Sequence, residues 1–184
     1  VCMIFRGIEQ YYKNDDPTES DSTMILAAAA ASLLDYVMRC ELNKTNPDNK
    51  RNLNQLDSTL SDHSERLERF ISCSAYRKRM YSYPMQCCQH ACIRLYFTWV
   101  RFSRALDLTL RAPVQTHCFV IALTSLSSEA PSLFAEAAVQ LLQVVWNVNL
   151  NMEGATSPRL LQLSCERALV NYVLIKFSRN PHEA

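Results

Sequence analysis

Glycine is nearly absent from this chain, since only Gly7 and Gly154 occur among its 184 residues. An average usage of about 7% would give roughly a dozen. Glycine supplies the positive φ angles of tight hairpins and the close backbone approach of phosphate-binding loops. A Rossmann fingerprint or a P-loop therefore cannot be built from this sequence, and hairpin-rich β folds are disfavoured.

Proline, by contrast, recurs between long segments that are compatible with helix. Because proline breaks a hydrogen bond in a helix interior, this pattern predicts helices separated at the prolines. We expect one helical domain spanning 1–184, an all-α compact array of six to seven helices joined mainly by short connections. An irregular bundle and a short HEAT-like stack both fit this pattern. The prolines are residues 17, 47, 84, 113, 131, 158 and 181.

The expected helices follow from apolar periodicity and from helix-favouring composition, such as the alanine run 27–31. Residues 1–23 are expected to form a partly ordered N-terminal arm whose apolar start is a short helix. Residues 43–52 are expected to be a flexible polar linker. The main predicted helices cover 24–42, 53–81, 85–111, 114–127, 132–150 and a last segment from 158 to the residue before 181.

The helix predicted at 53–81 carries a narrow seam of residues at alternating spacings of three and four. Such a seam is typical of antiparallel packing within one chain, and a homodimeric coiled coil is the alternative. The seam covers fewer than four heptads and includes His63 and Ser74, which favours packing within the chain. Its members are Leu53, Leu56, Leu60, His63, Leu67, Phe70 and Ser74.

Segment 132–150 is apolar enough to resemble a membrane span of about 20 residues. Glu136, Gln140, Gln143 and Asn147, however, recur at spacings of four, three and four, so they form a single polar stripe. A core helix with one wet edge explains this stripe better than lipid does. No membrane association is therefore expected.

The chain has eight cysteines, and several lie inside apolar helical runs, among them Cys92, Cys118 and Cys165. A reduced thiol in such a run behaves as a small buried hydrophobe. Reduced cysteines and the absence of a secretory-signal pattern favour a cytoplasmic or nuclear location. The glycosylation triplet beginning at Asn43 is the main feature against that location.

Metal-ligating residue types are densest around Cys88, His90 and Cys92, with His117 and Cys118 further along. On a helix Cys88 and Cys92 share a face, whereas His90 points away from both. The weak candidates Cys88, Cys92, His117 and Cys118 also lack the paired cysteine spacing usual for zinc. We expect no metal and no cofactor, and a zinc-stabilised nuclear or viral regulator is the alternative.

Nucleophilic catalysis requires a serine or cysteine with a base and an orienting group in hydrogen-bonding reach. His63 lies between Asp62 and Ser64, but neighbours on a helix point in different directions. No other spacing suggests a triad. We therefore expect no enzymatic activity.

Charge is distributed unevenly, although the formal net charge is only +1. Segment 66–111 carries nine basic residues against Glu68 and Asp107, whereas 112–158 contains three glutamates and no lysine or arginine. On the helix predicted at 85–111, the arginines share one side with apolar residues. A simple surface helix does not carry so much apolar area on its wet face. Either this helix is central, or its second face meets a partner.

We therefore expect a non-enzymatic helical interaction module of a larger intracellular regulator or assembly factor. Its arginine/aromatic helix face would bind an acidic or amphipathic peptide or a partner protein, with guanidinium groups pairing to carboxylates and apolar side chains as anchors. The alternative is a helical nucleic-acid-binding domain that also uses Arg77, Lys78 and Arg79. The predicted partner-binding residues are Arg94, Phe97, Arg101, Arg104, Leu108 and Arg111.

Overall fold

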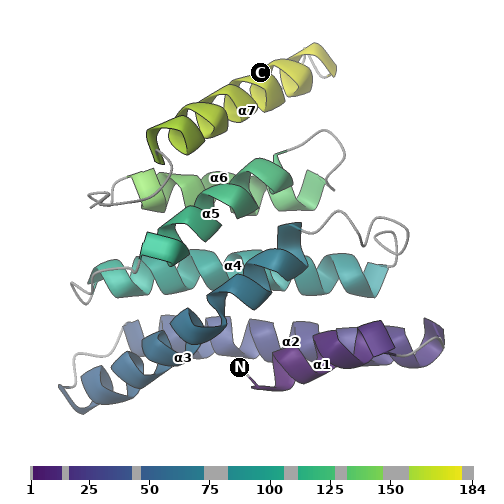
Figure 1. Cartoon of the computed structure of the whole chain (residues 1–184), viewed down its shortest axis with the longest axis vertical. Coiled ribbons are helices and arrows are strands. Elements are labelled where there is room, and N and C mark those ends of the chain that lie inside the picture. Colours follow the sequence, from purple (N-terminus) through teal and green to yellow (C-terminus); the bar gives the residue numbers. More distant parts are fainter. Residues whose placement is uncertain are drawn as a thin grey trace.

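The computed structural model describes residues 2–13, 17–42, 47–72, 83–105, 112–126, 132–146 and 158–179. These residues form seven helices that pack against one another, and they include no strand. The predicted all-α fold and compact helical array are therefore confirmed (Figure 1). The helices are α1 (Cys2–Lys13), α2 (Pro17–Leu42), α3 (Pro47–Ser72), α4 (Tyr83–Ala105), α5 (Ala112–Ser125), α6 (Ser132–Trp146) and α7 (Pro158–Arg179).

The prolines mark helix starts, which corrects two predicted boundaries. α2 begins at Pro17 and not near Met24, so residues 17–23 of the expected N-terminal arm are helical. α3 begins at Pro47, so residues 47–52 of the expected linker are helical as well. Proline fits the first helical position because its missing N–H would have no partner there and its φ angle is already helical. α3 ends at Ser72, and residues 73–81 of its predicted range lie outside the described segments.

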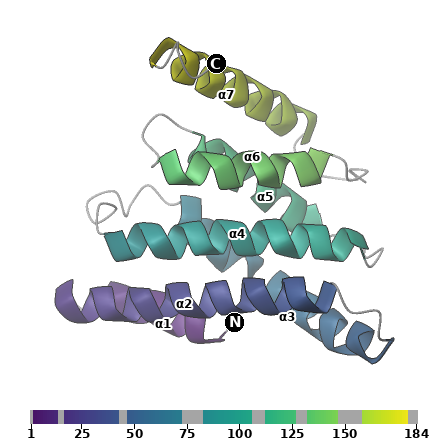
Figure 2. The same cartoon turned by 180° about the vertical axis from the view of Figure 1, so that it is seen from behind.

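The helices form a stack of two layers. α2, α4 and α6 lie side by side in one layer (Figure 2), and α3, α5 and α7 follow one another in the other. α1 packs on α2, α3 on α4 and α5 on α6, which joins the layers. Because one returning helix separates successive members of a layer, α2, α4 and α6 run in the same direction. α4 thus lies in the middle of its layer, whereas α2 and α7 lie at opposite ends of the stack (Figures 1 and 2).

α4 supplies the centre of the core and is fixed to α3 by polar contacts. Trp99, Tyr96 and Phe102 are fully buried. The indole Nε1 of Trp99 donates to Asp57 Oδ1 at 2.7 Å, and the Tyr96 hydroxyl donates to the Ser64 carbonyl at 2.6 Å. The α3 seam faces this core within the chain, as the spacing predicted. Its buried members are Leu60, Leu67 and Phe70.

α1 approaches α2 closely at Gly7. A Cβ at this position would lie 2.8 Å from the Ala27 Cβ and 3.0 Å from the Thr23 carbonyl oxygen. The alanine run of α2 and the missing side chain of Gly7 together allow this distance. Ile4, Phe5 and Ile8 of α1 are buried as a result.

Two apolar helices differ in how they meet solvent. In α6, Glu136, Gln140 and Gln143 are exposed, so the described part of the predicted polar stripe is confirmed. In α2, the stretch Asp21–Cys40 is the one described segment that could cross a membrane by length and composition, and 28% of it is buried. α2 therefore leaves much of its apolar surface uncovered by the other described helices.

Candidate functional site

α4 is buried on nearly all sides, and one row of its residues reaches solvent. Beyond the first turn, every described side chain of α4 that is exposed or half-buried lies on this row. The spacings of four, three, four, three and four keep the row on one face of the helix. We call this row the α4 strip, and its members are Tyr83, Cys87, His90, Arg94, Phe97 and Arg101.

Three of the six predicted partner-binding residues lie on the α4 strip. Arg94 and Arg101 are exposed, and Phe97 is half-buried against the core. Arg101 has no ion-pair partner among the residues that the structure describes. The side chain of Arg104 is not among those described. Leu108 and Arg111 lie outside the described segments, as do Arg77, Lys78 and Arg79.

Two apolar residues on the arginine side of α4, Ile93 and Val100, are covered by neighbouring helices, whereas Phe97 is half-buried. Ile93 and Val100 have no exposed surface, because α2, α3 and α6 surround α4. α4 is thus a central helix. This was one of the two explanations that the sequence allowed for the apolar residues on its arginine side. The α4 strip is the part of this helix that the neighbours leave open.

A groove of about 540 Å³ runs between α2 and α4, beside the α4 strip. One wall is made by small residues and Tyr36 of α2, and the other by the first half of the α4 strip. Two arginines, one from each helix, face this groove. Its lining residues are Ala28, Ala29, Ser32, Asp35, Tyr36, Arg39, Tyr83, Cys87, His90, Ala91 and Arg94.

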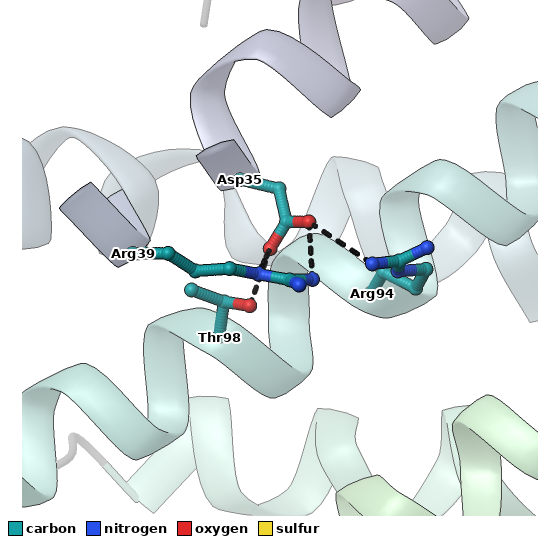
Figure 3. A network of polar contacts seen from close by, with 4 residues as sticks. All are labelled: Asp35, Arg39, Arg94 and Thr98. Atoms are coloured by element: carbon teal, nitrogen blue, oxygen red, sulfur yellow. Dashed lines mark hydrogen bonds and ion pairs between the residues drawn. The ribbon is translucent and has the colours of Figure 1, made fainter. Parts of the chain in front are cut away.

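A buried carboxylate connects the two walls of the groove (Figure 3). The side chain of Asp35 is 9% exposed and accepts two hydrogen bonds from Arg39, from Nε to Oδ1 at 3.1 Å and from Nη2 to Oδ2 at 2.5 Å. The Thr98 hydroxyl of α4 donates to Oδ1, and Arg94 Nη2 lies 3.8 Å from Oδ2. Asp35 therefore lies between two guanidinium groups, which satisfy a charge that burial would otherwise make costly.

The groove carries an excess of positive charge. Arg39 and Arg94 are 43% and 45% exposed and share one carboxylate, which leaves one guanidinium charge uncompensated within the lining. Burial lowers the pKa of His90, the charge of Arg94 lowers it further, and Glu136 opposes this shift. His90 is therefore mainly neutral at pH 7 and adds little charge. An anionic group fits this environment, because guanidinium pairs well with carboxylate and phosphate.

Two tyrosines flank the groove near solvent. Tyr36 on α2 and Tyr83 on α4 are each largely exposed. Each forms a hydrogen bond with the cysteine one turn further along, Cys40 and Cys87 respectively, and this bond raises the pKa of the tyrosine. Both hydroxyls are therefore neutral donors at physiological pH, next to a positively charged groove.

No three His, Cys, Asp or Glu side chains in the described segments come close enough to hold a metal ion. Of the weak zinc candidates, Cys92 is hydrogen-bonded to Cys88, and this bond and burial raise the pKa of the Cys92 thiol. Burial also raises the pKa of Cys118 and lowers that of His117. Thiolates, the form that binds metal or attacks an electrophile, are disfavoured at such positions.

The histidine that stood beside a serine in the sequence is a packing residue in the structure. The His63 ring lies against Phe5, with ring centroids 4.6 Å apart. The Ser64 hydroxyl donates to the Ser61 carbonyl and not to a base. These two side chains therefore do not form a nucleophile–base pair in this structure.

Sequence reasoning did not find the groove or Asp35. A weak signal was present, because Asp35 and Arg39 are a charged pair at i,i+4 spacing within an otherwise apolar stretch. Such a pair inside an apolar helix indicates a polar contact with another element. Its partners Arg94 and Thr98 belong to a helix far along the chain, so spacing alone could not identify them.

Comparison of the chain with protein families, with curated proteins and with solved structures finds no match. The functional argument consequently depends on the geometry and charge of the groove and of the α4 strip.

Proposed function

We propose that this protein is a non-enzymatic interaction module that binds an acidic, amphipathic segment of a partner protein along the groove and the α4 strip. The observation that supports this most directly is the opening left on a central, otherwise buried helix. That opening presents Arg94, Phe97 and Arg101 in one row, beside a groove with an excess guanidinium charge. Arginine and aromatic residues are enriched where partners bind most strongly.

The spacing on the α4 strip fits a helical ligand. Arg94 and Arg101 are seven residues apart, which is about 10 Å along the axis at 1.5 Å per residue. Two carboxylates seven residues apart on a partner helix have the same separation. Phe97 lies between the arginines and provides apolar contact area, and Ala29 and Tyr36 of α2 provide an apolar wall on the other side. The proposed ligand is therefore a helix with an acidic row beside an apolar one.

The layered architecture is consistent with a scaffold of the HEAT-like kind. Stacks of helix pairs present continuous surfaces to partners along their length. Here α2, α4 and α6 lie side by side in one layer (Figure 2). We accordingly propose a place in a larger regulator or assembly factor, in the cytoplasm or the nucleus.

A designed peptide tests the proposal without knowledge of the natural partner. The probe is a fluorescent amphipathic helix of about 18 residues, stabilised by its length and composition, with glutamates at i and i+7 beside a leucine row. Binding is measured by anisotropy for wild type and for Arg101→Glu. We expect the variant to bind at least about tenfold more weakly, because an attractive pair becomes a repulsive one.

Two controls make this result specific. Arg167→Glu changes another exposed arginine, which lies on α7 at the far end of the stack, and should leave binding unchanged. A probe with lysines in place of the glutamates should instead prefer Arg101→Glu over wild type. Equal binding of the glutamate probe by wild type and Arg101→Glu would contradict the proposal.

The same measurement with mixed-sequence oligonucleotides addresses the nucleic-acid alternative. Affinity that falls steeply and linearly with the logarithm of salt concentration would support that alternative. Peptide binding without oligonucleotide binding at low salt would support the interaction module.

A further inference from the structure

α2 has a second apolar face, which points away from its core contacts. At 100° per residue, its exposed large side chains fall on one stripe, opposite the buried row of Ala27, Ala31 and Met38. We call it the α2 stripe. Its members are Ile25, Leu26, Ala29, Leu33, Tyr36 and Val37, and their large side chains are between 42% and 64% exposed.

The α2 stripe is large and carries no charge. The remaining positions on the same face between residues 22 and 40 are Ser22, Ala30, Ser32 and Cys40. At about 200 Å² for a whole large side chain, the exposed fractions amount to roughly 600 Å². This area is at the upper end of the range of about 300–600 Å² for the largest apolar patch of a typical monomer, and such patches are often functional. In stacks of helices, moreover, the terminal unit needs a polar outer face to stay soluble, and α2 is a terminal helix of its layer.

We propose that two copies of this chain associate through their α2 stripes, with the two α2 helices antiparallel about a two-fold axis. An isologous contact sets the same surface against itself, so it needs a patch that does not repel itself, and an uncharged stripe meets this condition. Ala29 and Ser32 lie near the middle of the stripe, and their small side chains allow the two helix axes to come close. The symmetric contact buries both stripes at once.

The available area predicts a weak but specific dimer. Two stripes of roughly 600 Å² give about 1,200 Å² in total, the lower limit of specific interfaces. A dissociation constant in the micromolar range is therefore expected.

The end helix at the opposite side of the stack is a poorer surface for a second copy. α7 also exposes Leu163, Val170 and Leu174, but Arg167 is exposed in the same row. A head-to-tail contact between α7 and α2 would place this guanidinium on the apolar stripe. It would also generate an open chain of copies, because such contacts do not close on themselves.

A lipid surface is a poorer occupant as well. Helices that lie in a membrane interface carry lysines and arginines along the border of the apolar face. Arg39 is the single basic residue of α2 between 21 and 40, and it is paired with Asp35. Charge thus favours a second copy over anionic lipid.

Sedimentation equilibrium of the whole chain tests the dimer, with the double variant Leu26→Glu and Leu33→Glu. Neither residue lines the groove, so peptide binding by the monomeric variant can be measured separately, although Ala29 and Tyr36 belong to both the groove wall and the α2 stripe. Wild type should dimerise with a micromolar constant, and the variant should remain monomeric to at least about a hundredfold higher concentration. The control Leu163→Glu with Leu174→Glu, on α7, should dimerise like wild type, and circular dichroism should show unchanged helix content in all three.

A charge-pairing experiment tests the two-fold geometry. Leu33→Glu and Leu33→Lys should each be monomeric, whereas an equimolar mixture should restore the dimer, because the two positions approach each other across the axis. Failure of the mixture to associate would contradict the arrangement. The proposal would be overturned if wild type stayed monomeric at about 100 times the expected dissociation constant, or if the α7 variant lost association. Recruitment of monomeric wild type to anionic vesicles would also overturn it.

Discussion

α2 and α4 are neighbours in the same layer and both carry apolar residues on more than one face, yet they expose them very differently. Ile93 and Val100 lie on the arginine side of α4 and have no exposed surface. Leu26 and Leu33 lie on the outer side of α2 and are each more than 60% exposed. The difference is position, because α4 has helices on both sides in its layer and α2 has one. Apolar composition therefore indicates which helix faces can be buried, whereas the position of each helix in the stack determines which faces are buried.

The largest expected contrast is in stability. Trp99→Ala on α4 removes a fully buried side chain and its hydrogen bond to Asp57, and should lower the free energy of unfolding by about 3–5 kcal/mol. Leu33→Ala on α2 removes an exposed side chain and should change the free energy of unfolding by less than about 0.5 kcal/mol. Urea unfolding at a protein concentration below the proposed dimer constant measures both. A cost for Leu33→Ala close to that of Trp99→Ala would show that the α2 stripe is covered within one chain.

A smaller effect is expected where the two helices are joined by Asp35. Asp35→Ala leaves Arg39, Arg94 and Thr98 without their shared carboxylate, and should cost about 2 kcal/mol, as for hydrogen bonds to charged groups.

Glu65 on α3 provides the matched control for Asp35, because it pairs with Arg69 at i,i+4 spacing and at the same 2.5 Å. Both members of that pair are exposed, so Glu65→Ala should cost less than about 0.5 kcal/mol. Equal losses in Asp35→Ala and Glu65→Ala would mean that burial of Asp35 between the helices has no energetic consequence.

The smallest effect concerns pH and the groove. Burial and the charge of Arg94 lower the pKa of His90 in the folded chain, with Glu136 opposing, so the unfolded chain binds the proton more tightly. The contribution of neutral His90 to the free energy of unfolding is therefore fully present above the ordinary histidine pKa of about 6.5. It decreases as the pH falls from that value towards the lowered pKa of the folded chain.

Replacement of His90 by glutamine should make unfolding less sensitive to pH between about 7.5 and 5. Part of the slope should remain, because burial also lowers the pKa of His117. Thermal unfolding across this range measures the slope. A slope in His90→Gln as steep as in wild type would show that protonation of His90 costs the fold nothing.

Much of the fold could be predicted from local sequence. Scarce glycine and regularly placed prolines indicated an all-helical chain, and spacing placed Leu60 and Leu67 on the inner side of α3. Spacing likewise placed Glu136 and Gln140 on one wet edge of α6. The starts of α2 and α3 were placed too late, because the polar residues before 24 and before 53 were interpreted as loop, whereas Pro17 and Pro47 are first helical residues.

The candidate site was predicted in part. The row of Arg94, Phe97 and Arg101 followed from helical periodicity, because all three residues belong to one helix. The groove could not be predicted in this way, because it requires Asp35 of α2 to lie opposite Arg94 of α4. The register between two helices cannot be inferred from residue spacing within either helix. Arg94 was expected to contact a partner, and the structure also places its Nη2 3.8 Å from Asp35 Oδ2, a contact that spacing did not indicate.

The local sequence predicted the helix content, the inner face of α3 and the polar edge of α6. Helical hydrogen bonds and periodicity act between residues that are only a few positions apart. Which apolar faces are covered depended on the order of helices in the stack, since burial requires neighbours that come from elsewhere in the chain. Apolar helix faces of similar composition are therefore buried around Trp99 in α4 and exposed around Leu33 in α2.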